Sequence, residues 1–243
     1  MRAAEAAAAA YRGQLTRSRE LTRAAADMAL RKDLKERAGS ILMGGATRDA
    51  LVGDAAVARR GVADALALDR GPGSLASAAR VTGFLGDTVQ AQALVDEARR
   101  KMPATDTLFH AMNLPQAQAA IALGRNAPDK AVEALVPAAP YERGKVEIPY
   151  LRGLACLESG RGGEAIAEFQ KIIDNPGWGG RAVSLHVAHP LARLGLARAA
   201  ARAGDTAKSR RAYQDFLAMW KDADPDVPVL VQAKAEYAKL AGS

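Results

Sequence analysis

The stretch YLRGLACLESGRGGEAIAEFQKII, residues 150–173, contains two apolar helical segments joined at Gly160. Glycine suits this position because it readily adopts the left-handed backbone conformation that ends many helices. Ala165 lies five residues after the turn, Phe169 lies four residues further on, and Gly153 lies seven residues before the turn. The small residues allow the two helices to pack closely, and the large one fills the space to a neighbouring unit. The stretch therefore predicts a helical hairpin.

The same spacing recurs along the whole chain. The turns of the six copies fall at Gly13, Gly53, Gly86, Asn126, Gly160 and Gly204. Asn126 can replace glycine because asparagine also tolerates a left-handed turn. The other copies place small residues on the first helix at Ala46, Ala79, Ala119 and Ala197, small residues on the second helix at Ala58, Ala91, Ala131 and Ser209, and larger ones at Val62, Val95, Leu135 and Tyr213.

The distance between successive turns is 40, 33, 40, 34 and 44 residues, and two of these steps lie within one residue of the tetratricopeptide period. A lone hairpin leaves an apolar face exposed, so the hairpins must stack. We therefore expect an all-α, right-handed superhelical solenoid of about six antiparallel helix pairs with a concave and a convex side. As a single domain, it divides into a partial repeat at 1–33, repeats at 34–70, 71–104, 105–141, 142–178 and 182–222, and a capping helix at 226–241.

The end of the chain carries the largest apolar side chains. Tyr213, Phe216 and Trp220 fall on one face of a helix that Asp205 can cap, and we interpret them as core. Asp226 is expected to cap the final helix, with Pro228 in its first turn. That helix would cover the aromatic face, with the apolar residues Leu230, Ala233, Tyr237 and Leu240 turned toward it.

Composition narrows the classes of function. The 243 residues are 49% apolar but only 5% aromatic, which favours alanine-rich helices, and the single cysteine cannot form an internal disulfide. The net charge of +7 is modest and its basic residues are mixed with acidic ones, so a nucleic-acid site is disfavoured. No apolar run is long enough to span a membrane. We expect a cytoplasmic location, or an extracytoplasmic one if the chain is the tail of a membrane-spanning kinase.

Three stretches, residues 138–144, 150–174 and 213–240, resemble the C-terminal tetratricopeptide region of bacterial eukaryotic-like serine/threonine kinases. Similar regions follow winged-helix DNA-binding domains in bacterial regulators. The resemblance implies a sensing or recruiting role. The chain carries no kinase phosphate loop, HRD or DFG motif, so kinase activity is not implied. It begins inside the first repeat, which suggests a fragment or a truncated paralogue.

Residues with catalytic or metal-binding chemistry are few. His186 and His189 could share a helix face, but no further ligand lies close in sequence, and we interpret them as loop histidines with local hydrogen bonds. Cys156 is predicted to be a buried, unreactive thiol. The loop around Trp178, residues 177–181, could fold over a ligand or cover an edge of the fold. We therefore predict no enzyme, no cofactor and no metal.

The remaining hypotheses are a protein-interaction scaffold, or the regulatory C-terminal part of a kinase or winged-helix regulator whose N-terminal domain is absent. The tetratricopeptide resemblance implies a concave groove for a protein or peptide. The groove's three arginines against one glutamate favour an acidic partner. Residues implied to line it are Met43, Thr47, Arg80, Phe84, Gln116, Tyr150, Leu154, Glu158, Leu194, Arg198 and Arg202.

Overall fold

The computed structural model describes residues 2–179 and 186–241, and helices dominate both ranges, with no strand in either. The predicted all-α class is confirmed. A π-helical turn, Phe109–Asn113, precedes α7, and a 3-10 turn, Val136–Tyr141, follows α8. The helices are α1 (Arg2–Tyr11), α2 (Leu15–Leu30), α3 (Lys35–Leu51), α4 (Ala55–Leu68), α5 (Pro72–Phe84), α6 (Thr88–Lys101), α7 (Leu114–Gly124), α8 (Pro128–Ala134), α9 (Glu147–Glu158), α10 (Gly162–Asp174), α11 (Ala188–Arg202), α12 (Thr206–Met219) and α13 (Pro228–Ala241).

The turns inside the hairpins lie where the spacing predicts them. Each of the six predicted residues has a positive φ, from 53° at Asn126 to 90° at Gly53. The predicted cap of α12 is also present, because the Asp205 carboxylate accepts a hydrogen bond of 2.9 Å from the Lys208 amide. Two of the described residues with positive φ were not predicted: Asp33, between α2 and α3 with a φ of 55°, and Gly179, with a φ of 101°.

The predicted small and large positions make up much of the core. The small residues on the second helices, which are Ala58, Ala91, Ala131, Ala165 and Ser209, are all 0% exposed. The Ser209 hydroxyl donates a hydrogen bond of 2.9 Å to the Ala197 carbonyl, so a polar side chain is tolerated there. Phe169 is also 0% exposed, and its ring lies between two glycines, Gly153 of α9 and Gly195 of α11.

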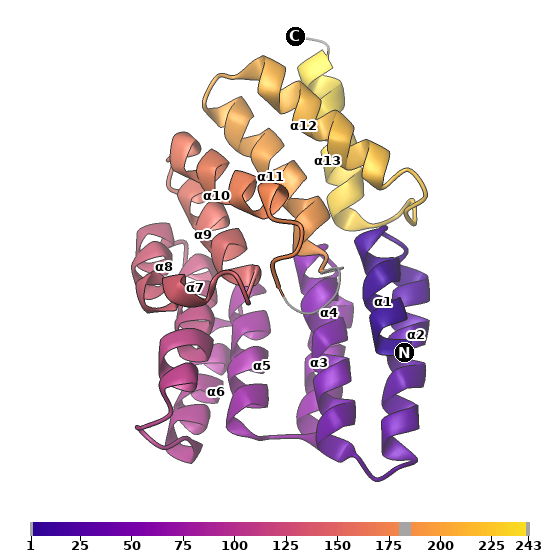
Figure 1. The fold of residues 1–243 in the computed structure, drawn as a ribbon, viewed down its shortest axis with the longest axis vertical. Coiled ribbons are helices and arrows are strands. Elements are labelled where there is room, and N and C mark those ends of the chain that lie inside the picture. Colours follow the sequence, from indigo (N-terminus) through magenta and orange to yellow (C-terminus); the bar gives the residue numbers. More distant parts are fainter. Residues whose placement is uncertain (1, 180–185, 242–243) are drawn as a thin grey trace.

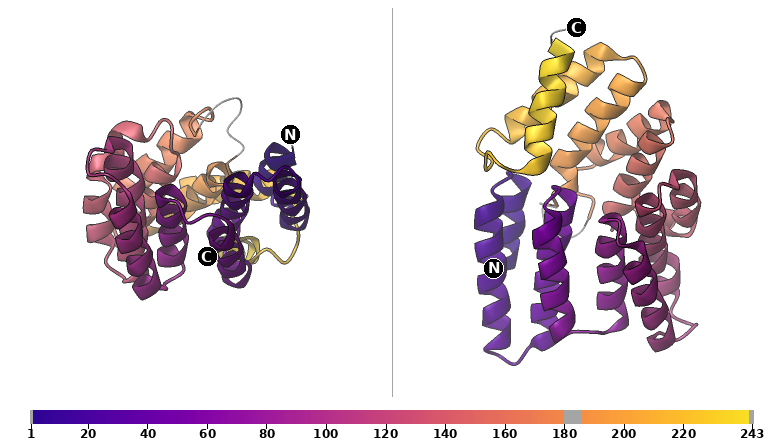
Figure 2. Two further views of the ribbon diagram at one scale, coloured as in Figure 1. Left: turned by 90° about the horizontal axis from the view of Figure 1, so that it is seen from below. Right: turned by 180° about the vertical axis from the view of Figure 1, so that it is seen from behind.

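From α3 onward, the first helices of successive hairpins contact one another. α3 contacts α5, α5 contacts α7, α7 contacts α9, and α9 contacts α11, so these helices form a continuous inner row. The second helices of the hairpins lie on the outer side of this row (Figures 1 and 2). This arrangement places one wall of first helices around the middle of the molecule.

The last helices contact the first hairpins, which the sequence did not predict. The Trp220 indole nitrogen donates a hydrogen bond of 3.0 Å to the Tyr11 carbonyl, and the Asp224 carboxylate accepts one of 2.7 Å from the Thr16 amide. The Val229 amide donates a bond of 3.1 Å to the Val52 carbonyl. The turns after α1 and α3 therefore meet the α12–α13 hairpin (Figure 1).

This contact corrects the expected role of the final helix. α13 does cover part of the aromatic face, since the rings of Tyr213 and Tyr237 lie 6.0 Å apart. Trp220, however, packs against the turn at Gly13 rather than being covered by α13 alone. The expected cap is also displaced, because α13 begins at Pro228 and Asp226 lies two residues before it.

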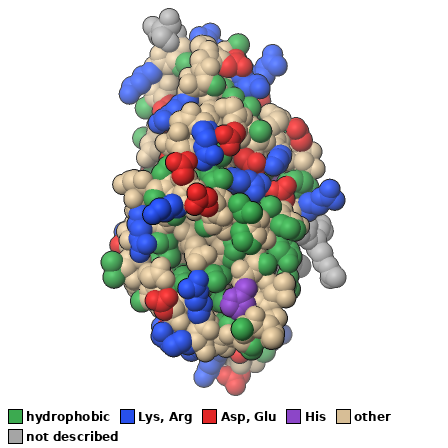
Figure 3. Space-filling model, turned by 90° about the vertical axis from the view of Figure 1, so that its left-hand side faces the viewer, with side chains coloured by type: hydrophobic (Ala, Val, Ile, Leu, Met, Phe, Trp, Pro, Cys, Tyr) green, Lys and Arg blue, Asp and Glu red, His purple; other side chains and the backbone are tan. Residues whose placement is uncertain are grey.

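The surface and the helices show two further properties. Basic and acidic side chains are interspersed on the face shown in Figure 3, an arrangement typical of solvated helix faces.

None of the helices that the structure describes combines the length and the apolar character needed to cross a bilayer.

Candidate functional site

The inner row of helices encloses a cavity in the middle of the molecule, which we call the central cavity. It consists of two adjoining hollows of about 20 and 180 Å³ that share the side chains of Ala50, Leu51, Phe84 and Tyr150. Its walls come from α3, α5, α9 and α11, and α13 closes one side through Val229 and Gln232. Helices from both ends of the chain thus build one site.

Most of the predicted groove residues lie at this cavity. Those that line it are Thr47, Arg80, Phe84, Tyr150, Leu154, Leu194 and Arg198. Gln116 lines a small neighbouring hollow of about 40 Å³, together with Arg80 and Glu147. Three predictions fall elsewhere: Met43 is buried in the core between α3 and α7, and Glu158 and Arg202 are exposed near the ends of α9 and α11.

The predicted surplus of positive charge is reduced by ion pairs within the chain. Arg80 lies 3.5 Å from the Glu147 carboxylate. Arg198 donates two hydrogen bonds, of 2.9 and 3.1 Å, to the carboxylate of Glu236 on α13. Such a bidentate pair is among the stronger hydrogen-bonded arrangements in proteins. Each arginine therefore has a carboxylate that a ligand would have to share or replace.

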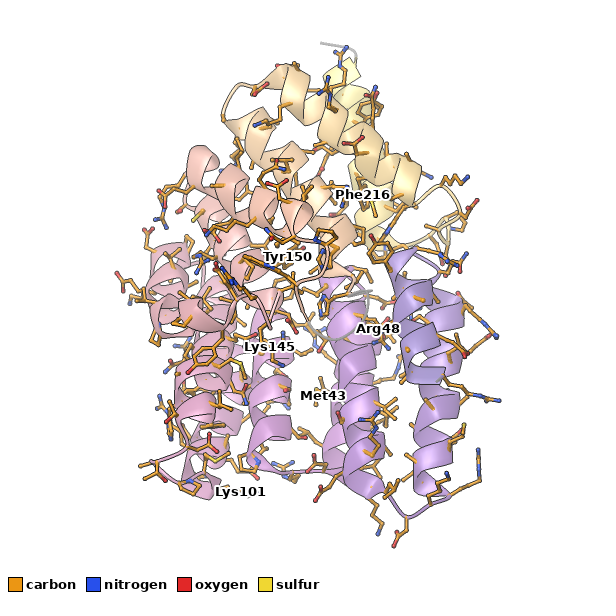
Figure 4. The ribbon with its side chains drawn as sticks, viewed as in Figure 1. Met43, Arg48, Lys101, Lys145, Tyr150 and Phe216 are labelled. Atoms are coloured by element: carbon orange, nitrogen blue, oxygen red, sulfur yellow. The ribbon has the colours of Figure 1, made fainter. Side chains whose placement is uncertain are left out.

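Tyr150 lies between the two hollows and near the middle of the molecule (Figure 4). It is only 6% exposed, and its ring meets that of Phe169 edge to face at 6.0 Å. Burial raises the pKa of the Tyr150 phenol to about 12, against a smaller opposing effect of the Arg198 charge. The tyrosine is thus neutral at physiological pH and serves as an apolar wall of the cavity.

Burial and neighbouring charges have opposite effects on the pKa of Glu147. Burial opposes ionisation of this carboxyl, but its contact with the His186 ring and the positive charges of Arg80 and Lys145 outweigh burial and hold the pKa of Glu147 well below its usual range. The lowered pKa means that the ionised carboxylate stabilises the folded chain above the unfolded-state pKa of about 4.3. This contribution is lost as the pH falls through the folded-state pKa.

We predict that Glu147→Gln flattens the acid limb of the stability curve. Thermal melts between about pH 5 and pH 2 should show a melting temperature that falls less steeply for the variant than for the wild type. Glu133→Gln, on the exposed surface of α8, is the matched control and should follow the wild type. Parallel curves for Glu147→Gln and the wild type would contradict the role assigned to Glu147.

Both candidate histidines were predicted to lie in a loop; His186 lies before α11, but His189 lies in the first turn of α11, which corrects that prediction. The His186 ring accepts a hydrogen bond of 3.1 Å from the Ala188 amide, and its other nitrogen lies 3.5 Å from Glu147. His189 is buried, its ring lies 3.1 Å from the Trp178 carbonyl, and burial lowers its pKa despite that bond. Within residues 2–179 and 186–241, no cluster of three or more His, Cys, Asp or Glu side chains could hold a metal ion.

Cys156 and the Trp178 loop are the remaining features that the sequence analysis considered. Cys156 is buried, and burial raises the pKa of its thiol, which keeps it protonated. Trp178 is half-buried rather than fully exposed. Residues 180–185 lie outside the described residues. They include the end of the 177–181 loop and the start of the predicted 182–222 repeat.

Comparison with known proteins assigns no family. No family model matches the chain. A search of curated proteins also finds no match. The resemblance to kinase-associated tetratricopeptide regions therefore rests on the quoted stretches alone, and the central cavity has to be interpreted from its own residues.

Proposed function

We propose that the chain is a non-catalytic interaction scaffold of the tetratricopeptide type, a superhelical solenoid that binds a protein segment at its central cavity. The observation that carries this proposal is the composition of the cavity wall: half-buried Phe84 and Leu154 lie beside Tyr150, with Arg80 and Arg198 near its two ends. An apolar pocket flanked by hydrogen-bonding charges is the usual form of a site that anchors one large side chain.

The size of the cavity favours a peptide side chain over a cofactor. Its larger hollow measures about 180 Å³, whereas sites for drug-sized molecules span roughly 300–1,000 Å³. We propose that the partner inserts a large apolar side chain against Tyr150. Acidic residues flanking that side chain would then compete with Glu147 and Glu236 for the two arginines, which favours an acidic partner.

The test uses Gln232, which is exposed on α13 and lines the larger hollow. Gln232→Glu changes the charge without changing the shape, and for an acidic partner one added like charge should weaken binding roughly threefold to tenfold. Gln232→Lys should strengthen the same interaction. The measurement is capture of proteins from a bacterial lysate by each immobilised variant, quantified by mass spectrometry over a range of bait concentrations.

The control is the neighbouring residue, because Val231 is 51% exposed and does not line the cavity. Val231→Glu adds the same charge to α13 and should leave the captured proteins unchanged. If Gln232→Glu, Gln232→Lys and the wild type retrieve the same proteins with equal affinity, the partner does not bind at the central cavity.

A further inference from the structure

A second hollow lies away from the central cavity, in the groove between α2 and α4, and we call it the α2–α4 groove. α3 packs against both of these helices and forms the floor. The hollow has a volume of about 400 Å³, and the side chains used below that line it are Thr22, Arg23, Leu42, Arg48, Val57 and Arg60. This volume is within the range of small-molecule sites.

Arg48 is a largely buried cation on the floor of this groove, on the side of α3 that faces α1 and α2 (Figure 4). Its Nη2 donates a hydrogen bond of 2.7 Å to the Thr22 hydroxyl, which in turn donates one of 2.7 Å to the Ser18 carbonyl. Its Nε is shut off from solvent and has no hydrogen-bond partner. No carboxylate of the described residues lies within 4.0 Å of Arg48.

The nearest acid is hydrogen-bonded to a different arginine. Asp49 follows Arg48 in sequence, but its carboxylate accepts a hydrogen bond of 2.8 Å from Arg19 of α2. Arg19 also donates one of 2.7 Å to Asp54, so these three residues form a closed network. Arg48 therefore forms no ion pair of its own among the described residues, and burial lowers its pKa despite the attraction of the Asp49 charge. Burying a charge in this state is costly unless something compensates for it.

The charges around Arg48 indicate that the groove would attract an anion. Arg23 and Arg60 line the groove from α2 and α4, both are exposed, and neither forms an ion pair within the described residues. Glu20 is paired with Arg17 at 3.0 Å. Asp64 is thus the one acid of the lining without an ion pair in the described part of the chain, against the three unpaired arginines Arg23, Arg48 and Arg60. An anion entering the groove would meet a net positive surface.

The shape of the groove favours an anion with an apolar body. The Arg48 guanidinium lies across Gly44 and Gly45 of its own helix, where a Cβ would come within 3.6 and 3.8 Å of its Nη1 and Nη2. Leu42 and Val57 provide an apolar wall beside it. We propose that the α2–α4 groove binds a small organic oxyanion, with its carboxylate or phosphate held by Arg48 and its apolar part against α3 and α4.

The experiment follows the Arg48 side chain directly. Benzoate and phenyl phosphate are titrated into the ¹⁵N-labelled chain at constant ionic strength, and the Nε–Hε resonance of Arg48 is monitored by NMR. We expect a saturable shift with at least one probe, at roughly millimolar concentration for ligands of this size. The probe that binds more tightly identifies carboxylate or phosphate as the preferred group. Benzyl alcohol, which lacks the charge, should cause no saturable shift.

Arg48→Met and Arg60→Met separate ligand binding from a structural role. Arg48→Met keeps an unbranched apolar stem, so we expect a melting temperature equal to or above that of the wild type, because an unpaired buried charge is removed. Binding of the preferred probe, followed for this variant by backbone amide shifts, should weaken at least tenfold. Arg60→Met, at the exposed rim, should weaken it less than threefold. The proposal fails if neither probe saturates, if Arg48→Met binds as the wild type does, or if Arg48→Met melts well below the wild type.

Discussion

A chain ending at Asp224 should melt roughly 10 °C or more below the full chain and should associate in solution. Removing α13 uncovers Tyr213 and Phe216, and leaving such side chains exposed costs about 1.5–3 kcal/mol each. It also removes Glu236, which pairs with Arg198 and accepts a hydrogen bond of 2.9 Å from the Tyr213 hydroxyl. The loss approaches the total stability of many domains, about 5–15 kcal/mol. Thermal melts and light scattering measure both effects.

Point variants on α13 test the same contact without shortening the chain. Leu230 is 2% exposed and Val231 is 51% exposed, although they are neighbours on one helix. Leu230→Ala should cost about 2–5 kcal/mol, and Val231→Ala should change stability by less than about 0.5 kcal/mol. A chain ending at Asp224 that stays monomeric and melts with the full chain would show that α13 is a detached tail.

Phe169→Ala should destabilise the fold by about 3–5 kcal/mol. The ring is fully buried and lies between Gly153 and Gly195, which have no side chains that could move into the space left behind. Collapse around the site is therefore limited, and the cost should fall toward the upper part of this range. Phe84→Ala deletes the same atoms from a half-buried position and should cost less than half as much. Chemical denaturation of the three proteins provides the comparison.

A double-mutant cycle tests the glycine contact itself. A Cβ at position 195 would lie 2.5 Å from the Phe169 ring, so Gly195→Ala alone should destabilise the chain by about 1–3 kcal/mol. In the Phe169→Ala background the same methyl group enters empty space, and alanine is the better helix former by about 1 kcal/mol. The second substitution should then be neutral or stabilising. Additive costs in the cycle would mean that Gly195 and Phe169 do not share this space.

The local parts of the fold could be predicted from sequence because their signals are local. A left-handed turn favours glycine or asparagine, and the small residue five positions later is required by the helix that packs on it. The contact between Thr16 and Asp224 has no such signal, because it joins residues 208 positions apart. It depends on how far each hairpin rotates relative to the one before it, and single residues do not reveal that rotation.

The candidate site could also be predicted only in part from sequence. Phe84, Tyr150 and Arg198 were placed on one wall by the tetratricopeptide resemblance, because positions two, six and ten residues before each turn fall near one face of the first helix. Their partners could not be predicted, because Glu236 comes from α13, which reaches the cavity through the contact of the chain's two ends. Arg48 was missed for another reason: a surplus of arginine is usually exposed, and only the geometry shows that its one neighbouring acid, Asp49, is bound elsewhere.

The hydrogen bonds of Thr16 with Asp224 and of Val52 with Val229 also limit how this protein can change in evolution. An open array of helical hairpins can gain or lose a unit, because each unit contacts only its neighbours. Here an extra hairpin would separate the first and last units by about 10 Å, the width of a packed helix, and would break both bonds. Duplication or deletion of a hairpin should therefore destabilise this fold, and we expect the number of hairpins to be constrained. A change of binding specificity that preserves both bonds would then come from substitutions within the existing hairpins.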